Sequence, residues 1–284
     1  MKEIDELHSI VKNKYDKGLS DIGGLRLVAE ISLEKLGTTG ICDYFHERKK
    51  YNVFGVPGYL SRPILSDYFI LDRRKFRILW EKFISSINRE MHTSSMDAVE
   101  VDRVVYTAIM SFAACYDIWK NKSRKTPGTH FELLLGSLLS LFAPHLVRSK
   151  FISLPNQDEK VATDIVFSSQ KGGLVIPAKI TTRERIVQPY AHQRILDSIF
   201  PDLRYKSVLL CVSETQRDDV RTRVNDICVP GTIKLFQTHL ARLSAIYYLD
   251  PPDRYLDSDM TKIIQVSRLS QLFCKDLPAL LPKA

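Results

Sequence analysis

The chain has 284 residues, 44% of them apolar, with a formal net charge of +8 at pH 7 and a pI near 9.1. This length and composition predict an ordinary globular protein with a substantial core. No apolar run reaches membrane-spanning length, and charges occupy the start where a secretory signal would be apolar, so we expect a cytoplasmic protein without membrane contact. Five cysteines without a CxxC pair argue against a disulfide framework or zinc site, and the positive charge weakly favours a polyanionic partner.

Apolar residues recur at helical spacing from residue 1 to about residue 120, for example at Phe76, Leu79, Trp80 and Phe83. This pattern predicts an all-helical N-terminal region. The segment at 120–128, KNKSRKTPG, combines four positive charges with Ser, Pro and Gly, which is typical of an exposed connection. We therefore expect one helical domain over residues 1–122 and a second domain over residues 123–284.

The pattern changes after this connection. A long apolar helix is expected at 131–146, followed by short β-branched runs at 150–154, 161–167, 174–180 and 207–212 that read as strands. A further helix is expected at 183–200, between the last two strands. The order of helix, three strands, helix and strand predicts an α/β fold in which helices flank a mixed sheet.

Two charged residues stand out in these strands. Asp164 interrupts the apolar strand VATDIVF, and Lys179 ends the next strand, LVIPAKI. A buried carboxylate is costly unless it is paired or bound to a metal. Phosphodiester hydrolysis needs carboxylates that hold Mg²⁺ and a positive group that orients water and offsets developing charge. The two residues supply one of each, although Lys179 could also be a solvated strand end.

The wider arrangement resembles a known family. Asp164 and Lys179, preceded by a helix that carries Glu132, resemble the PD-(D/E)XK nuclease core. The stretch KITTRER, from Lys179 to Arg185, resembles the signature of type II restriction endonucleases that read CCGG or CC-x-GG, the group of BsaWI, AgeI, NgoMIV and EcoRII. The resemblance covers the second half of the chain and hardly extends to the first.

The resemblance implies a restriction-endonuclease-like mixed-sheet core that cleaves both strands of double-stranded DNA at a short palindromic site containing CCGG, with Mg²⁺ as cofactor. It also implies a homodimer or higher homo-oligomer, and a DNA methyltransferase that protects the host. Residues 123–284 would then carry catalysis and recognition, while residues 1–122 would support DNA binding or dimerisation.

In this family the residues after the lysine read base pairs, which implies that role for Arg183, Glu184 and Arg185. Arginine suits bidentate bonding to guanine O6 and N7, and a carboxylate can accept from cytosine N4. Glu184 could instead bind metal or pair with a neighbouring charge on a helix surface. Further possible DNA contacts, each with an alternative role in packing or in solvation of the connection, are Gln188, Tyr190, Lys122 and Lys125.

The sequence departs from the family pattern at the second metal ligand. Pro177 stands where the motif has an acidic residue, and related enzymes take a substitute fourteen positions after the lysine, which here is Gln193. Its neutral amide oxygen would bind Mg²⁺ more weakly than a carboxylate. Glu132 is also a candidate metal ligand, but with Thr129 it forms a T-x-x-E pattern that could simply cap a helix. His192 is a weaker candidate for a general base.

Two other functions remain open at this stage. Pro177 and Gln193 fit a DNA-binding protein whose nuclease fold has lost its metal site, whereas Asp164 and Lys179 speak against that reading. A structure-selective repair nuclease is a third possibility, but it would have no use for a base-reading group. Digestion of a mixed-sequence plasmid distinguishes the three.

Overall fold

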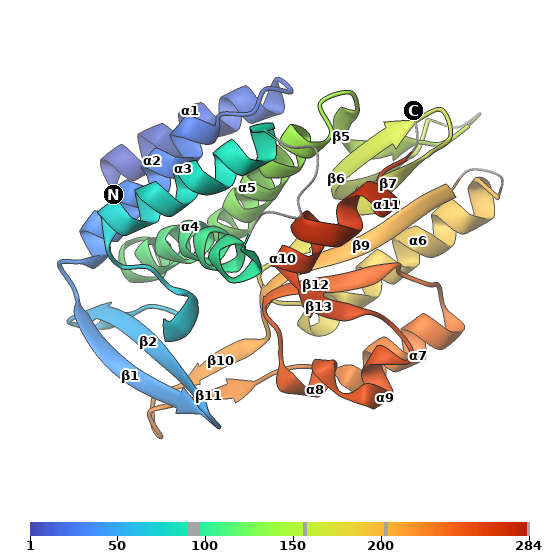
Figure 1. Cartoon of the computed structure of the whole chain (residues 1–284). Helices are drawn as coiled ribbons and strands as arrows, with labels where there is room; N and C mark the ends of the chain where they lie inside the picture. Colours follow the sequence, from blue (N-terminus) through green and yellow to red (C-terminus); the bar gives the residue numbers. More distant parts are fainter. Residues whose placement is uncertain (90–96, 156–157, 202–203, 283–284) are drawn as a thin grey trace. The chain divides into compact units, whose positions relative to one another are not determined.

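The computed structural model describes residues 1–89, 97–155, 158–201 and 204–282, which form two compact units (Figure 1). The first comprises Met1–Phe142 with Thr215–Asp226, and the second comprises Ala143–Glu214 with Ile227–Ala284. This division does not follow the expected boundary at residues 122 and 123. Compact units need not coincide with functional domains, so the assignment of roles to the two halves stays a prediction. Within the described ranges, no helix is long and apolar enough to cross a membrane.

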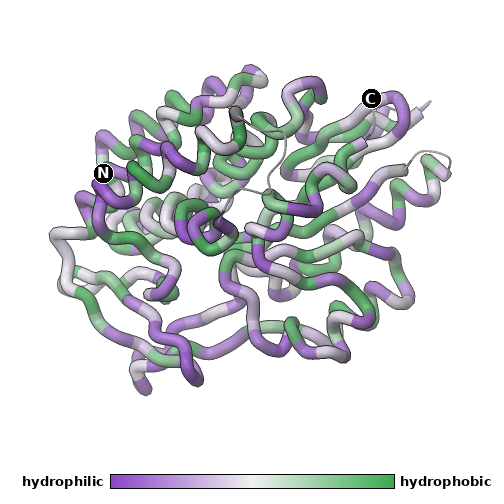
Figure 2. Tube along the Cα trace, viewed as in Figure 1, coloured by the Kyte–Doolittle hydropathy of each residue, from purple (hydrophilic) through white to green (hydrophobic). Residues whose placement is uncertain are grey.

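The first unit contains the helices expected from the sequence. They are α1 (Lys2–Asp16), α2 (Ile22–Leu36), α3 (Arg73–Arg89), α4 (Ala98–Trp119) and α5 (Thr126–Phe142). Asp21 and Asp97 precede α2 and α4, and their side chains accept hydrogen bonds from backbone N–H groups of the first turn. Helix α4 is buried along most of its length, which agrees with its predominantly hydrophobic residues in Figure 2.

The expectation of an all-helical N-terminal region is wrong, because this unit also contains a sheet. Its strands are β1 (Gly40–His46), β2 (Lys49–Val56), β3 (Tyr59–Leu60), β4 (Ile64–Leu65), β10 (Thr215–Asp218) and β11 (Arg223–Asp226). They are ordered β10-β11-β1-β2-β3, and β4 pairs with β2; the turn η1 (Ser66–Tyr68) follows β4. Residues 40–56 are rich in the aromatic and β-branched residues that favour strands, and Tyr51, Val53 and Phe54 are buried.

The second unit confirms the predicted mixed sheet flanked by helices. Strands β5 (Val147–Ser153), β6 (Lys160–Ser169) and β7 (Gly172–Ile176) form an antiparallel meander. Strands β8 (Ala178–Lys179), β9 (Arg204–Ser213), β12 (Ala245–Asp250) and β13 (Val266–Arg268) extend it in parallel, giving the order β13-β12-β9-β7-β6-β5 with β8 beside β9. The predicted strands overlap β5, β6, β7 with β8, and β9, and two of them, 150–154 and 174–180, run one residue past the end of the observed strand.

Helices cover this sheet. They are η3 (Arg183–Ile186), α6 (Val187–Ile199), α7 (Pro230–His239), α8 (Asp253–Leu256), α9 (Ser258–Thr261), α10 (Leu269–Gln271), η4 (Leu272–Asp276) and α11 (Leu277–Leu280). Helix α6 buries Tyr190, Gln193 and Leu196, which recur at helical spacing on one face. Leu196 packs with residues of β5, β6 and β7, whereas Tyr190 packs with residues of β9, β12 and α7. The sheet and α6 thus form a rigid support for the polar residues between β7 and α6.

The start of helix α5 corrects one local prediction. The helix begins at Thr126, inside the segment expected to be a connection between domains, rather than at residue 131. Thr129 therefore lies within the helix and is not its N-terminal cap. The capping role considered for Glu132 loses its geometric basis, because a capping box requires the threonine at the first helix boundary.

Candidate active site

Asp164 and Lys179 meet at the break between β7 and β8. Ile165 pairs with Ile176 across the antiparallel strands, so Asp164 lies opposite Pro177. One carboxylate oxygen, Asp164 Oδ2, accepts hydrogen bonds from the backbone N–H of Ala178 at 2.7 Å and from Lys179 Nζ at 2.8 Å. The sequence prediction that these two charged groups meet is consistent with this geometry.

Pro177 explains why the carboxylate lies where it does. Proline has no N–H to donate to a neighbouring strand, and here the chain leaves β7 and continues as β8 beside β9. The carbonyl of Pro177 accepts from the backbone N–H of Leu210 at 2.9 Å. Asp164 satisfies the next N–H, that of Ala178, with its side chain. The side chains of Asp164 and Lys179 are 19% and 14% exposed, so the pair is partly shielded but reachable from solvent.

The other candidate metal ligands are not gathered around this pair within the second unit. Glu132 is a partly exposed residue of α5 and belongs to the first unit. In the described part of the chain, no group of three or more His, Cys, Asp or Glu side chains is placed to hold a metal ion. Asp164 is therefore the carboxylate at the break between β7 and β8 that offers the hard oxygen ligand preferred by Mg²⁺.

Gln193 faces a different part of the sheet. Its Nε2 donates to Asp197 Oδ1 at 2.7 Å and to the carbonyl of Tyr205 at 3.0 Å, while its buried Oε1 has no hydrogen-bond partner among the described residues. Both partners are acceptors, which fixes the orientation of the amide. Tyr205 precedes Leu210, the strand partner of Ala178, by five positions, roughly 16 Å along a strand. The hydrogen bonds of Gln193 thus tie its Nε2 to Asp197 and to the start of β9, and its role as a metal ligand stays a prediction.

His192 lies within electrostatic range of the pair. Burial lowers the pKa of this imidazole, the charge of Lys179 lowers it further, and the charge of Asp164 opposes both. Its buried Nδ1 has no hydrogen-bond partner within the part of the chain that the structure describes. The lowered pKa favours the neutral imidazole, and the role of His192 as a general base stays a prediction.

The predicted base-reading residues form a tight turn directly after β8. We call residues 182–186 the arginine turn. Arg183 and Arg185 are exposed, and Arg183 has a backbone φ of 42°, in the left-handed region. The N–H of Arg185 donates to the carbonyl of Thr182 at 2.9 Å, and Ile186 is buried in the core. The side chain of Glu184 lies outside the described residues.

Of the further DNA contacts considered, three are on the surface and one is not. Gln188 is exposed on α6, and Lys122 and Lys125 are exposed between α4 and α5. Tyr190 differs from the expectation, because it is 0% exposed and its ring packs 5.7 Å from that of Phe236. The helical spacing that places Tyr190 on the same face as Leu196 turns it into the core, where it has no surface to offer to DNA.

Sequence reasoning missed a buried carboxylate that contacts the arginine turn. Glu214 follows β9 directly and is 0% exposed. It accepts hydrogen bonds from the backbone N–H and the hydroxyl of Thr182, and from the Tyr248 hydroxyl at 3.1 Å. Burial raises its pKa, while these hydrogen bonds act in the opposite direction. The available signal was an acidic residue immediately after the apolar run of β9.

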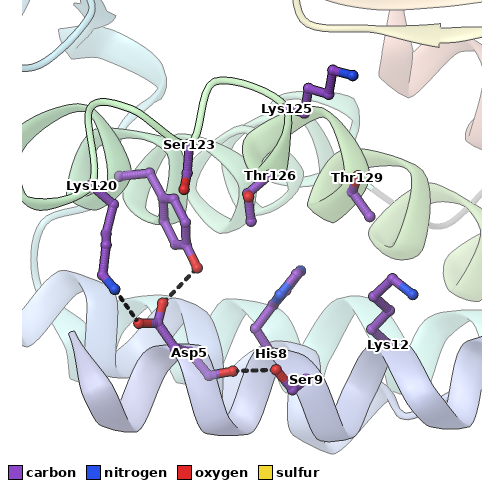
Figure 3. A pocket seen from close by; sticks show the side chains of 10 residues that line it. Asp5, His8, Ser9, Lys12, Lys120, Ser123, Lys125, Thr126 and Thr129 are labelled. Atoms are coloured by element: carbon purple, nitrogen blue, oxygen red, sulfur yellow. Dashed lines mark hydrogen bonds and ion pairs between the residues drawn. The ribbon is translucent and has the colours of Figure 1, made fainter.

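A separate pocket of about 400 Å³ lies within the first unit, between α1 and the start of α5 (Figure 3). Asp5 binds Lys120 at 3.1 Å and accepts from the Tyr116 hydroxyl at 2.6 Å there. His8 and Lys125 also line this pocket. Because the Asp5 carboxylate is already paired with the Lys120 ammonium and the Tyr116 hydroxyl, we assign this pocket no part in catalysis.

No protein-family model and no curated protein matches the chain significantly. Among solved structures, that of the type IIP restriction endonuclease Kpn2I matches with a TM-score of 0.88 and 38% sequence identity, over 98% of this chain and 97% of the other. This chain belongs to the type II restriction endonucleases. The restriction endonuclease has the mixed α/β fold that its sequence predicted. Its activity is also the predicted one, cleavage of DNA at specific sites.

A second solved structure, the restriction endonuclease PspGI in complex with substrate DNA, is much more distant. It matches with a TM-score of 0.46 and 12% identity, over 73% of this restriction endonuclease and 92% of its own chain. That likeness is too weak to transfer roles to single residues. The assignments of Asp164, Lys179 and the arginine turn therefore rest on the geometry of this chain and on the motif they form.

Proposed function

We propose that this restriction endonuclease hydrolyses both strands of double-stranded DNA at a short palindromic site containing CCGG, in a reaction that depends on Mg²⁺. The observation that carries the proposal is the continuity of one short segment. Lys179 binds Asp164 at 2.8 Å, and the chain reaches the exposed Arg183 four positions later. A residue suited to hydrolysis, Lys179, and a residue suited to base recognition, Arg183, thus lie on one short segment of backbone, so binding of the bases can position the phosphate for cleavage.

Each member of the charged pair has a chemical task in this proposal. Asp164 would hold Mg²⁺, with Glu132 and Gln193 as further candidate ligands, and the oxygen atoms of these residues suit that ion. When bound, Mg²⁺ would supply Lewis-acid stabilisation of the charge that develops on the phosphate. Lys179 orients the attacking water and offsets negative charge in the transition state, and its hydrogen bond to Asp164 holds the ammonium in place.

The arginine turn would read the C:G pairs. Arg183 and Arg185 are exposed, and each guanidinium can form two parallel hydrogen bonds with guanine O6 and N7. Glu184 would accept from cytosine N4. A palindromic target requires two-fold symmetry, so the active form would be a homodimer or a higher homo-oligomer. A cytoplasmic enzyme of this kind would need a DNA methyltransferase that protects the host's own sites.

Digestion of a mixed-sequence plasmid tests the proposal. With Mg²⁺ the enzyme should produce discrete fragments, and sequencing of their ends should show a common palindrome that contains CCGG. A parallel digestion with EDTA should leave the plasmid intact. Discrete fragments whose ends share a different palindrome would contradict the CCGG assignment, and cleavage in EDTA would contradict the role of Mg²⁺.

A further inference from the structure

Among the described residues, the polar groups that contact the buried carboxylate of Glu214 are hydrogen-bond donors. Thr182 contributes its backbone N–H, at 2.9 and 3.1 Å from the two carboxylate oxygens, and its hydroxyl. The backbone N–H of Arg183 and the hydroxyl of Tyr248 complete the set. Burial raises the pKa of the Tyr248 hydroxyl well above its usual range, so this group stays protonated and donates. A carboxylate, which only accepts, matches these partners better than any neutral side chain of its size.

These bonds hold the arginine turn at its most constrained point. Arg183 adopts a φ of 42°, a conformation that residues with a Cβ rarely adopt unless their surroundings enforce it. Glu214 accepts hydrogen bonds from the backbone N–H of Arg183 itself and from that of Thr182, the residue before it. At the other end of the turn, Ile186 is 2% exposed and packs in the core. The exposed arginines therefore lie between two anchored positions, the hydrogen bonds to Glu214 and the buried side chain of Ile186.

Burying the Glu214 carboxylate costs free energy because it removes a charged group from water, and apolar packing does not offset that cost. Among the residues that the structure describes, no lysine or arginine forms an ion pair with it, and hydrogen bonds are what stabilise its charge. Glu30 provides a contrast. That carboxylate is also 0% exposed, but it binds Arg26, Arg73 and Arg77 within the first unit. Glu30 joins helices to one another, whereas the donors on Glu214 that the described residues provide belong to the arginine turn, apart from the Tyr248 hydroxyl.

We propose that Glu214 is a positioning residue for DNA recognition, which fixes the backbone of Thr182 and Arg183 so that Arg183 and Arg185 meet the base pairs in one register. This inference rests on the proposed function of the arginine turn as the base-reading element. Hydrogen bonds to a guanine edge need the guanidinium within a few tenths of an ångström of its place. Loosening the turn should therefore weaken binding to the correct sequence more than binding to any other.

The variant Glu214→Gln tests the proposal, with Glu30→Gln as its matched control. The amide replaces one acceptor with a donor that faces other donors, while size is unchanged. Affinities are measured for the duplex identified by sequencing the fragment ends and for a scrambled duplex. We expect Glu214→Gln to lower the ratio of the two affinities at least about tenfold. Glu30→Gln should leave this ratio unchanged, even if it lowers the thermal midpoint of unfolding as much as Glu214→Gln does.

A second measurement follows the turn itself without DNA. Trypsin cleaves after exposed arginines, and cleavage after Arg183 and Arg185 should be faster in Glu214→Gln than in the parent or in Glu30→Gln. The pair Thr182→Val and Thr182→Ser serves if Glu214→Gln does not fold, because only the serine keeps the hydroxyl that Glu214 accepts. Thr182→Val should then lower the affinity ratio, and Thr182→Ser should restore it.

Two results would overturn the positioning role. One is an unchanged affinity ratio in folded Glu214→Gln, and the other is an equal loss of affinity for both duplexes. The variant Arg183→Ala separates this failure from a failure of the proposed function. If Arg183→Ala lowers the ratio and Glu214→Gln does not, the arginine turn reads bases without help from Glu214. If Arg183→Ala itself weakens both duplexes equally, the base-reading assignment is wrong.

Discussion

Asp164 uses a single carboxylate oxygen to accept both the Lys179 ammonium, at 2.8 Å, and the backbone N–H of Ala178, at 2.7 Å. The same atom thus joins the start of β8 to β6 and holds the cation proposed to act in hydrolysis. Structure and chemistry are combined in this residue, so its replacement must be chosen to separate the two. Asparagine keeps an oxygen that can accept from Ala178 but removes the charge.

We predict that Asp164→Asn and Lys179→Ala each lower the rate of plasmid cleavage on the order of a hundredfold or more. Both variants should still bind the correct duplex with near-parent affinity, because these groups serve the reaction more than recognition. Lys160→Ala is a matched control, since Lys160 lies on β6 and its ammonium is 4.5 Å from the centre of the Phe151 ring. A cleavage rate near that of the parent in either active-site variant would remove that residue from the site.

Replacement of Gln193 tests the second metal ligand. A carboxylate at this position should bind Mg²⁺ more tightly than the neutral amide, so Gln193→Glu should reach half-maximal cleavage at a lower Mg²⁺ concentration. The new carboxylate would face Asp197 and the carbonyl of Tyr205, which now accept from Nε2. The change is therefore best made together with Asp197→Asn, with Asp197→Asn alone as the control. An unchanged dependence on Mg²⁺ would show that Gln193 is not a ligand.

The charged pair was predictable because its determinants are local. Strands β6 and β7 are short apolar runs joined by a tight turn, and such neighbours form antiparallel pairs. Their pairing places the residue before Ile165 next to the end of β7, so the spacing from Asp164 to Lys179 was sufficient to suggest a contact. The partners of Gln193 were not predictable, since the direction of a buried amide depends on acceptors such as Tyr205 that belong to the next strand.

The missed features depend on pairings between distant parts of the chain. Strand β11 lies beside β1, with Phe45 opposite Arg223, and no local pattern links these two segments. The importance of Glu214 likewise arises from Thr182, which lies 32 positions earlier. The sequence pattern places Glu214 just after a strand, but only the assembled sheet shows that the arginine turn is next to it.

Two buried histidines of the first unit, His8 and His130, should make the protein less stable in mild acid. Burial lowers the pKa of His8 to about 4, and burial also lowers that of His130 well below its usual value of 6.5. Their rings are 5.3 Å apart, and His8 lies beside Phe112 (Figure 3 shows His8 on α1). In this range the unfolded chain binds protons that the folded chain does not. The contribution of these two histidines to stability is thus fully present above pH 6.5 and is lost as the pH falls toward 4.

We predict that His8→Phe reduces this loss. The parent's free energy of unfolding should fall more steeply between pH 6.5 and 4.5 than that of the variant, by up to about 1.4 kcal/mol per pH unit. Urea unfolding at several pH values measures the slope. His239→Gln, at an exposed position at the end of α7, should leave the slope as it is in the parent. Equal slopes in the parent and His8→Phe would contradict the role of this histidine.

The last prediction separates base reading from general attraction to phosphate. If Arg183 and Arg185 each form bidentate bonds with guanine, removal of one should cost roughly 1 to 3 kcal/mol on the correct duplex and much less on a scrambled one. Lys122 and Lys125 are exposed between α4 and α5 and would contact phosphates. Loss of either lysine should weaken both duplexes about equally and lower the salt slope of binding by about one unit.

The measurement is a set of binding titrations with both duplexes at two salt concentrations, for Arg183→Ala, Arg185→Ala and Lys122→Ala. The arginine variants should change the ratio of the two affinities and leave the salt slope on the scrambled duplex nearly unchanged, because a base edge carries no condensed counterions. The lysine variant should show the reverse. Should the arginine variants lose affinity equally for both duplexes and also lower the salt slope, Arg183 and Arg185 bind phosphate, and the CCGG assignment would be wrong.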